Sequence, residues 1–493
     1  MQLSESGAES GDARLAGLKV ALVFPTFLDT RLASYQDNAR FLGLIPPLNL
    51  SYVAGALKAA GAEVLLLDCP AEGLRIPGAL ARLRDFAPDY LGFTLTSVDW
   101  LSSLAWIRAL HDALSVPVIV GGIHLECYPL EILTHECIAL GLIGHADLAL
   151  AELLEAHQEG GDLSTVPGAV WREDGEPRMT PPRKRPKTDE GMPGPARELL
   201  QVHKHFSIVS TERNFTAAMS NFGCPFGCEF CILRADPLRK RSAMSVVDEM
   251  ERCYHEHGVQ EIDFFDPVFT LPKARVFAIC DEIERRGLHR RMIWSIRART
   301  DIVDEAILDR MWRAGCRRIF YGIESGDEGV LRRVDKRMKS LDDVRTVVRA
   351  TKARGYEVLA FVMIGNPLET RATVAATRAL LLELPIDLVQ VASLFPLPNT
   401  PIYKAIVAQT GVDIWREHTL HETDIRPMTR LDTALGEQDI DRLVAETYAH
   451  FYLRPSFVRF ALKRIKHPGQ LTRGLAAAAG ITRSYLLPET HRG

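Results

Sequence analysis

The sequence predicts an α/β protein: a doubly wound (Rossmann-like) N-terminal domain, then a partial TIM-like (β/α)6 barrel, then a helical C-terminal region. Two observations lead to this prediction. Short apolar runs typical of buried parallel strands alternate with stretches of helical spacing along most of the 493 residues. A stretch rich in proline, glycine and charge, near residues 180–195, interrupts the alternation once and so separates two sheets.

The doubly wound domain is expected at residues 18–156, after a flexible polar tail at 1–17. Its first strand, at 18–24, is a continuous apolar run that ends at Pro25. Further strands are expected at 63–67, 90–94, 117–120 and 138–143, with helices at 50–60, 101–114 and 146–156. In such a sheet a ligand binds at the carboxyl ends of the strands.

Residues 157–205 are predicted to form a linker with a small hairpin at 169–178, and residues 206–410 to form the barrel. The barrel strands are expected at 216–221, 261–265, 291–296, 318–321, 357–363 and 388–394. Residues 411–493 are predicted to be helical, with one helix at 437–452 and a basic helix near 456–466.

Composition and charge exclude several classes of protein. Hydrophobic residues make up 47% and charged residues 25% of the chain, which is ordinary globular usage and excludes a disordered or fibrous protein. The 59 Lys and Arg against 63 Asp and Glu give a net charge of −4, so no nucleic-acid partner is expected. The polar N-terminus lacks the apolar centre of a signal peptide, and no apolar run predicts a membrane span, so we expect a cytoplasmic protein.

Three of the nine cysteines lie together in the sequence NFGCPFGCEFC at 221–231. Cys224, Cys228 and Cys231 have the spacing C-x3-C-x2-C, on a loop expected to leave the first barrel strand. Three thiolates can bind three irons of a [4Fe–4S] cluster and leave the fourth iron open for a ligand. A zinc site is the alternative, but zinc takes four ligands and no second pair of cysteines or histidines follows. The spacing therefore favours the cluster.

This loop and the strand ends after it resemble the radical S-adenosylmethionine superfamily. Beyond the cysteines, the resemblance rests on DFFDPVF at 263–269, WSIRAR at 294–299, RIFYGIESG at 318–326 and FVMIGNPLET at 361–370. It implies that the cluster binds S-adenosylmethionine and cleaves it to a 5′-deoxyadenosyl radical. It further implies contacts to S-adenosylmethionine from Phe230, Asp266, Arg297, Glu324 and Gly365.

The first domain resembles the cobalamin-binding domain found ahead of such barrels. The family pattern D-x-H-x-x-G corresponds to DCPAEG at 68–73, where Asp68 and Gly73 match but Pro70 replaces the histidine. The resemblance therefore implies base-off cobalamin with no histidine ligand from this loop. It also assigns cobalamin contacts to Thr94, Gly121 and Gly122. A site for another nucleotide, or no site, is the alternative; a dinucleotide is disfavoured because no G-x-G-x-x-G follows the first strand.

The basic helix near 456–466, SFVRFALKRIK, has an amphipathic pattern. A packed helix with a solvated basic face accounts for the pattern, and so does a peripheral contact with a membrane surface or an apolar substrate. Both interpretations stay open from the sequence.

Together the two resemblances imply a methyltransferase that acts on an unactivated carbon by way of methylcobalamin and a 5′-deoxyadenosyl radical. An oxidative cyclase of tetrapyrrole type is an alternative within the enzymes, and a cobalamin or iron–sulfur sensor without turnover is an alternative outside them. The expected partners are a small-molecule substrate (a lipid, an isoprenoid or a tetrapyrrole) and an external electron donor such as flavodoxin or ferredoxin. The sequence assigns no acid or base that acts on the substrate.

Overall fold

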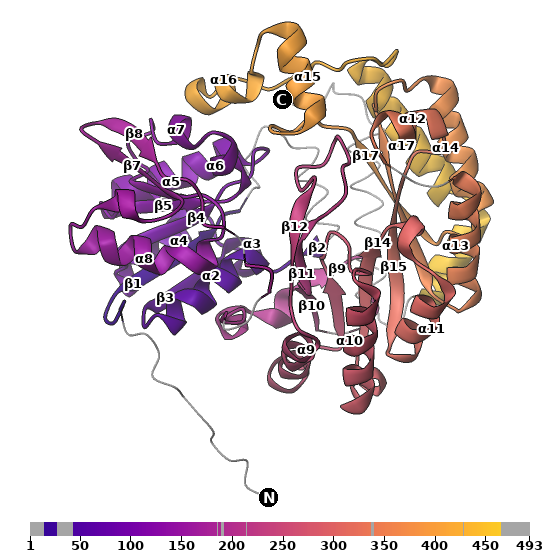
Figure 1. Ribbon diagram of the computed structural model, residues 1–493, viewed down its shortest axis with the longest axis horizontal. Coiled ribbons are helices and arrows are strands. Elements are labelled where there is room, and N and C mark those ends of the chain that lie inside the picture. Colours follow the sequence, from indigo (N-terminus) through magenta and orange to yellow (C-terminus); the bar gives the residue numbers. More distant parts are fainter. Residues whose placement is uncertain are drawn as a thin grey trace, which may run out of the picture.

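The computed structural model describes residues 14–26, 43–184, 186–188, 192–212, 214–336, 340–426 and 428–464. Its first sheet has the strand order β3-β1-β4-β5-β6-β7-β8, in which β3 to β6 are parallel (Figure 1). These parallel strands are β1 (Lys19–Phe24), β3 (Glu63–Asp68), β4 (Tyr90–Thr94), β5 (Val118–Gly121) and β6 (Leu140–Leu142). The order reverses between β1 and β4, where a doubly wound sheet opens a crevice at the carboxyl ends of its strands.

Helices cover both faces of this sheet, as expected for a doubly wound domain. Along β1, Val20 and Leu22 pack in one buried cluster with α2 (Leu48–Ala59) and α8 (Ala146–Gln158). Ala21 and Val23 point the other way, toward the remaining helices. These are α3 (Cys69–Glu72), α4 (Ile76–Phe86), α5 (Trp100–Leu114), α6 (Ile123–Cys127) and α7 (Pro129–Ile132).

Helix α4 was not expected, because Pro77 and Gly78 are poor helix formers. The structure places Pro77 in the first turn, where a helix needs no N–H donor from that position.

The hairpin expected inside 157–205 does form, as β7 (Ala169–Glu173) and β8 (Glu176–Met179). It pairs antiparallel with β6, so part of this stretch extends the first sheet. The limits of the domains themselves stay a prediction.

The second sheet confirms the partial barrel. Its six strands are all parallel and follow one another in chain order: β10 (Phe215–Ala218), β13 (Glu261–Phe264), β14 (Ile293–Ala298), β15 (Cys316–Glu324), β16 (Glu357–Ile364) and β17 (Leu388–Ser393). Helices cover its outer side: α9 (Ala243–His257), α10 (Lys273–Arg285), α11 (Glu305–Arg313), α12 (Glu328–Arg333), α13 (Leu341–Ala353) and α14 (Arg371–Glu383). Side chains alternate along each strand, so that on β15 Ile319 and Tyr321 join the outer core while Arg318 and Phe320 face inward.

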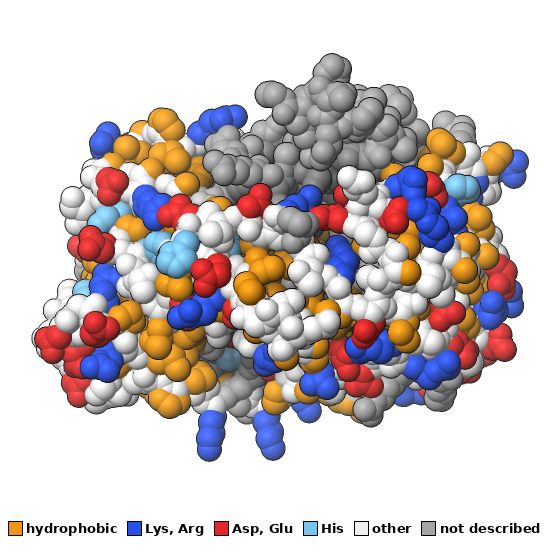
Figure 2. Space-filling model, turned by 90° about the horizontal axis from the view of Figure 1, so that it is seen from above, with side chains coloured by type: hydrophobic (Ala, Val, Ile, Leu, Met, Phe, Trp, Pro, Cys, Tyr) orange, Lys and Arg blue, Asp and Glu red, His pale blue; other side chains and the backbone are white. Residues whose placement is uncertain are grey.

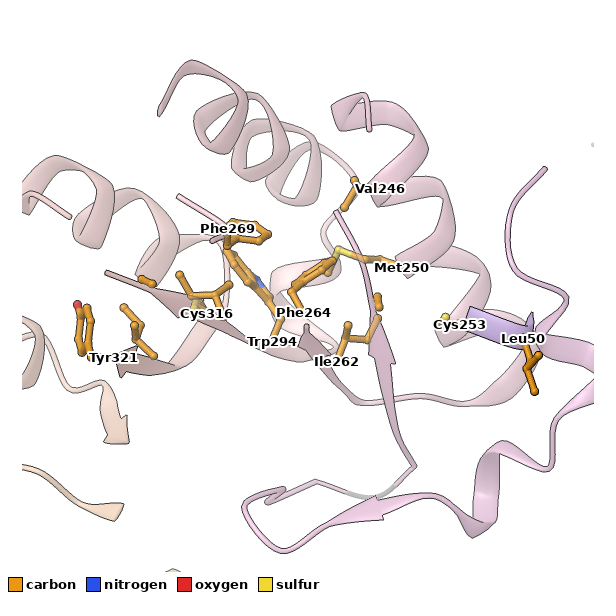
Figure 3. Close-up of a cluster of buried hydrophobic side chains, with 14 of the residues drawn as sticks. Leu50, Val246, Met250, Cys253, Ile262, Phe264, Phe269, Trp294, Cys316 and Tyr321 are labelled. Carbon is orange, nitrogen blue, oxygen red and sulfur yellow. The ribbon is translucent and has the colours of Figure 1, made fainter. Parts of the chain in front are cut away.

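One buried cluster joins the two sheets. Figure 3 shows it running from Leu50 of α2 through Cys253 and Met250 of α9 to Phe264 and Trp294 of the barrel. All five side chains are at most 4% exposed. Burial of apolar side chains contributes roughly 1.5–3 kcal/mol each, so this shared core attaches the first domain firmly to the outside of the barrel.

The C-terminal helices are α15 (Pro401–Thr410), α16 (Ile414–His421), α17 (Glu437–Tyr452) and α18 (Pro455–Arg464). Helix α16 packs against α7 of the first domain. Tyr128 of the first domain and Tyr403 of α15 both donate to Asp413 Oδ1 at 2.8 Å, and Arg416 donates to Glu131 at 2.8 Å. The end of the chain therefore bridges back to its beginning.

Helix α18 covers the interior of the barrel. Phe457 and Phe460 pack beside Phe320 and Leu359, and Arg464 pairs with Glu357 at 2.9 Å. The apolar face that would have met a membrane thus contacts the barrel. Residues 465–493, which include the end of the predicted basic helix, lie outside the described residues.

None of the described helices is long and apolar enough to cross a membrane. Figure 2 shows acidic and basic side chains intermixed on the face that carries α15 and α16.

Candidate active site

The cysteine loop begins in a hairpin that follows β10. Its strands are β11 (Asn221–Cys224) and β12 (Asp236–Lys240), and their register shifts at Gly223. Gly223 has a φ of +84°, and a Cβ there would lie 2.4 Å from the carbonyl oxygen of Pro237. Only glycine fits this position without displacing the hairpin. The sequence predicted a single strand here, and the hairpin that presents Cys224 was missed.

Three free thiols lie on this loop. Cys228 is buried, while Cys224 and Cys231 are partly exposed. The Cys231 N–H donates to the Cys228 carbonyl oxygen at 3.1 Å, so the loop turns tightly between them. Burial raises the pKa of the Cys224 and Cys231 thiols, and negative charge at Cys228 raises it further, which places the three sulfurs within electrostatic reach of one another.

This donor set suits a [4Fe–4S] cluster. Its ligands are thiolates alone, one for each of three irons. Among the described residues, no three His, Cys, Asp or Glu side chains converge as the ligands of a single ion, and a cluster does not require that, since each cysteine binds a separate iron. Two cations act on the thiols: Arg299 and Lys336 both oppose the rise in the pKa of Cys224 that burial causes.

Arg299 is the arginine that reaches the cysteines. Its Nη1 lies 3.6 Å from Cys228 Sγ, and its guanidinium lies 4.0 Å from the centre of the Phe226 ring. The sequence analysis assigned Arg297 a contact with S-adenosylmethionine, which stays a prediction, and did not foresee the contact of Arg299 with Cys228. The structure pairs Arg297 with Asp263 through two hydrogen bonds of 2.9 and 3.2 Å. Arg297 lies within β14, whereas Arg299 follows directly after the carboxyl end of that strand.

Asp266 is buried beneath the hairpin. Its carboxylate accepts hydrogen bonds from the Ser220 N–H at 2.6 Å and from Asn221 Nδ2 at 3.0 Å. Burial raises the pKa of Asp266. The side chain therefore fastens the start of the cysteine loop to the end of β13, and these contacts use the oxygens that were expected to meet S-adenosylmethionine.

Glu324 ends β15 with a φ of +66° and pairs with Lys336 at 2.8 Å. Both side chains are at most 10% exposed. A Cβ at Gly322 would lie 2.6 Å from Glu324 Oε1 and 2.9 Å from Lys336 Nζ, so this glycine makes room for the pair. The charge of Lys336 also opposes the rise in the pKa of Cys231 that burial causes, which places Lys336 near the loop. The sequence analysis missed Lys336 because it lies outside the strand-end patterns.

Gly365 forms a turn with a φ of +97°. Its N–H and that of Asn366 both donate to the Glu369 carboxylate. Burial raises the pKa of Glu369 to about 7. Phe230 packs in a small cluster with Val334 of the segment after α12 and with apolar residues of α15, so it supports the loop from within.

In the first domain, Asp68 caps α3 by accepting from the Ala71 N–H at 3.2 Å. Its second oxygen lies 2.7 Å from His205 Nε2, and both side chains are at most 4% exposed. Pro70 lies in the first turn of α3, and Gly73 ends the helix with a φ of +67°. The sequence analysis did not foresee His205, which lies 137 residues from Asp68 in the chain.

Thr94, Gly121 and Gly122 meet at the carboxyl ends of β4 and β5. Thr94 Oγ1 accepts from Asn49 Nδ2 at 2.9 Å. A Cβ at Gly122 would lie 2.7–2.8 Å from the Leu95 backbone and from Thr94 Oγ1, so Gly122 brings the two strand ends together. A Cβ at Gly121 would lie 3.6 Å from the Leu142 carbonyl oxygen, which is an ordinary contact distance.

His124, beside this glycine pair, is fully partnered. Its Nδ1 lies 3.1 Å from Ser97 Oγ, and its Nε2 lies 3.2 Å from Thr419 Oγ1 of α16. Burial lowers the pKa of His124 to about 3, so the ring is neutral. His124 therefore links the first domain to α16.

Comparison with known proteins identifies both halves of the chain. Residues 220–381 match the family model of the radical SAM superfamily, and residues 37–154 match that of the B12 binding domain. The "Uncharacterized methyltransferase PH0819" of Pyrococcus horikoshii is 30% identical over 468 residues, which cover 89% of this chain and 94% of that protein. The chain belongs to the cobalamin-dependent radical S-adenosylmethionine enzymes.

Two further relatives of this cobalamin-dependent radical S-adenosylmethionine enzyme show the breadth of the family. The anaerobic magnesium-protoporphyrin IX monomethyl ester cyclase of Rubrivivax gelatinosus is 23% identical over 473 residues, covering 94% of this chain and 82% of the cyclase. The structure of the radical S-adenosylmethionine methyltransferase TsrM from Kitasatospora setae has the same fold, with a TM-score of 0.66 and 22% identity over 79% of this chain and 76% of that one.

These matches confirm the predicted cofactors of the enzyme: a [4Fe–4S] cluster, S-adenosylmethionine and cobalamin. The structure also fits the groups. The three thiols suit the cluster, and the hydroxyl of Thr94 and the open backbone at Gly121 suit an amide-rich ligand in the crevice of the first sheet. The roles assigned to individual residues stay proposals.

Proposed function

We propose that the enzyme transfers a methyl group from S-adenosylmethionine, by way of cobalamin, to an unactivated carbon of a small molecule. The observation that carries the proposal is the similarity to a methyltransferase over nearly the whole length of both chains. When bound, the cluster supplies the electron that cleaves S-adenosylmethionine, and cobalamin carries the methyl group.

The chain's own residues would prepare this chemistry. Cys224, Cys228 and Cys231 hold the cluster at the mouth of the barrel. Asp266 and Asn221 fix the position of the loop through buried hydrogen bonds. The first domain presents cobalamin from the carboxyl ends of β4 and β5, at Thr94, Gly121 and Gly122.

The substrate proposed here is an apolar or planar small molecule, and the inner wall of the barrel is rich in aromatic rings. The Arg297 guanidinium lies between the Phe265 ring, at 3.9 Å, and the Phe320 ring, at 4.9 Å. Phe320 stacks on Phe361 with ring centres 5.7 Å apart. These rings are covered by one another, by Arg297 and by α18, and Phe320 is 4% exposed, so they form part of the packed core. The proposed substrate is a tetrapyrrole, a lipid or an isoprenoid, and the similarity to the cyclase favours the tetrapyrrole.

An oxidative cyclase is the second candidate. The observation that favours it is the similarity to a cyclase over 94% of this chain. The two candidates share their cofactors, so they differ in whether the methyl group of S-adenosylmethionine reaches cobalamin.

The electron donor proposed here is a small one-electron carrier such as flavodoxin or ferredoxin, and the proposed location is the cytoplasm. Both rest on the cluster, which requires reduction and protection from oxygen. The membrane contact suggested by the sequence gains no support from α18, since Phe457 and Phe460 pack inside the barrel.

The test is an anaerobic assay with the reconstituted enzyme, cobalamin, a reductant and S-adenosylmethionine that carries a deuterated methyl group. Mass spectrometry would follow the label in the corrinoid fraction and the release of 5′-deoxyadenosine. Both signals together support a methyltransferase. 5′-Deoxyadenosine without label in the corrinoid supports the cyclase. If both signals are absent, both enzyme proposals are contradicted and the sensor is left.

The Cys228→Ala variant should release no 5′-deoxyadenosine. Cys127→Ala, which removes a half-buried thiol outside the loop, is the matched control and should retain the release.

A further inference from the structure

We propose that Arg299 raises the reduction potential of the iron–sulfur cluster by donating a hydrogen bond to the sulfur of Cys228. The contact is direct: Nη1 of Arg299 lies 3.6 Å from Cys228 Sγ, within the range of hydrogen bonds to sulfur. The inference concerns the cluster alone, so it holds for methyl transfer and for cyclisation alike.

The guanidinium of Arg299 is held in one orientation by Asp301 and Phe226. Its Nε and Nη2 donate to the two oxygens of Asp301, each at 2.9 Å. Its face covers the Phe226 ring at 4.0 Å. The side chain is 6% exposed, so water competes little for its N–H groups. With Nε and Nη2 fixed on Asp301, Nη1 is directed at the sulfur.

Two neighbouring cations, Arg297 and Lys336, are paired with carboxylates. Arg297 pairs with Asp263, and Lys336 pairs with Glu324. Lys336 acts on the sulfurs through its charge alone, whereas Arg299 also makes a hydrogen bond to sulfur. Arg299 also has a carboxylate partner, but it uses a different edge of its guanidinium for Cys228.

Electrostatics give the direction of the effect. A cluster that takes up one electron from the donor gains one negative charge, which is shared with the cysteine sulfurs. A charge-assisted hydrogen bond to one of these sulfurs stabilises the reduced state more than the oxidised state. Arg299 therefore makes the cluster easier to reduce, and Asp301, a fixed negative charge behind the guanidinium, limits the gain.

The experiment is a potentiometric titration of the reconstituted full-length enzyme with dithionite, in the absence of S-adenosylmethionine, followed by electron paramagnetic resonance. Arg299→Gln keeps a hydrogen-bond donor but removes the charge. At a fixed solution potential we expect about a tenfold lower ratio of reduced to oxidised cluster, which corresponds to a shift of about 59 mV to more negative values for one electron. Arg299→Lys, which keeps the charge, should shift less.

Two variants separate this role from a structural one. Asp301→Asn removes the balancing charge and should shift the potential in the opposite direction, to less negative values. Arg333→Gln removes a cation that pairs with Glu229, next to Cys228, at 2.9 Å, and it should leave the potential unchanged. Iron and sulfide content would be measured for every variant.

An unchanged potential in Arg299→Gln with a full complement of iron would overturn the proposal. So would an equal shift in Arg333→Gln, because that result would assign the effect to total charge rather than to the contact with sulfur. If Arg299→Gln fails to load iron, the Asp301→Asn titration decides: a shift to more negative values contradicts the proposal.

Discussion

Tyr448 and Tyr452, one turn apart on α17, both place their hydroxyl groups on the backbone of β17. The Tyr448 hydroxyl accepts from the N–H of Val391 and donates to its carbonyl oxygen, each at 3.0 Å. The Tyr452 hydroxyl does the same at Val389, at 3.0 and 2.6 Å. Strand β17 is the last of the open barrel sheet, so its outer edge would otherwise present unpaired backbone groups. Two side chains replace a seventh strand there.

Replacing both tyrosines with phenylalanine should destabilise the protein. Each Tyr→Phe change leaves a backbone N–H and carbonyl without a partner, at a cost of about 1–3 kcal/mol. Urea unfolding followed by circular dichroism would measure the loss. Tyr254→Phe on α9, a helix on the outside of the barrel, is the control. An equal loss of stability there would contradict the proposal that the two hydroxyl groups stabilise the edge of β17.

Gly223→Ala should disrupt the cysteine loop. The added methyl group carries two penalties: a positive φ, which costs about 1–3 kcal/mol, and a close approach to the Pro237 carbonyl. We expect a loss of bound iron after reconstitution, measured by iron analysis and absorption. Gly175→Ala has nearly the same φ, +85°, but open space around the Cβ. It should keep its iron, and a similar loss in both variants would mean that the contact with Pro237 is unimportant.

Glu369 should make stability depend on pH. Burial raises its pKa from 4.5 to about 7 in the folded protein. Between these values the folded state holds a proton that the unfolded state has released, so the free energy of unfolding should fall as the pH rises from 4.5 to 7. The fall attributable to this group is on the order of 3 kcal/mol.

Urea unfolding at several pH values would test this, with Glu369→Gln expected to give a flatter profile across that range. Glu383→Gln, on the exposed side of α14, is the control and should follow the parent profile. A Glu369→Gln profile as steep as that of the parent would assign the dependence to other groups.

Asp68→Ala should weaken the first domain more than an ordinary cap mutation. It removes the cap of α3, worth about 0.5–2 kcal/mol, and it leaves the buried His205 ring without its partner. Thermal unfolding and retention of cobalamin on a desalting column would both report the loss. Asp304→Ala removes the cap of α11 at the protein surface. Equal losses in the two variants would show that the contact with His205 adds nothing.

The sequence was informative where a signal is local. Apolar runs gave the strands of both sheets to within a few residues, and the spacing of Cys224, Cys228 and Cys231 indicated the cluster. The contact of Arg299 with Cys228 was not local and was not foreseen. Arg299 follows the end of β14, and its contact with sulfur depends on where the distant cysteine loop lies.

Contacts between distant segments could not be predicted. Nothing near Asp68 in the sequence points to His205, and Lys336 lies beyond the strand end where a pattern would be sought. The basic helix near 456–466 was ambiguous for a related reason: an amphipathic face shows that something apolar covers it but not what. In the structure that partner is the inner surface of the barrel.

The shared core between the two sheets also bears on how the protein denatures. Separating the domains would open the shared cluster at Leu50 of α2 and would break the bridge at Asp413. Neither half can therefore melt alone without losing part of the other's interior. A calorimetric scan should show a single cooperative transition, in which the corrinoid and the iron are released together.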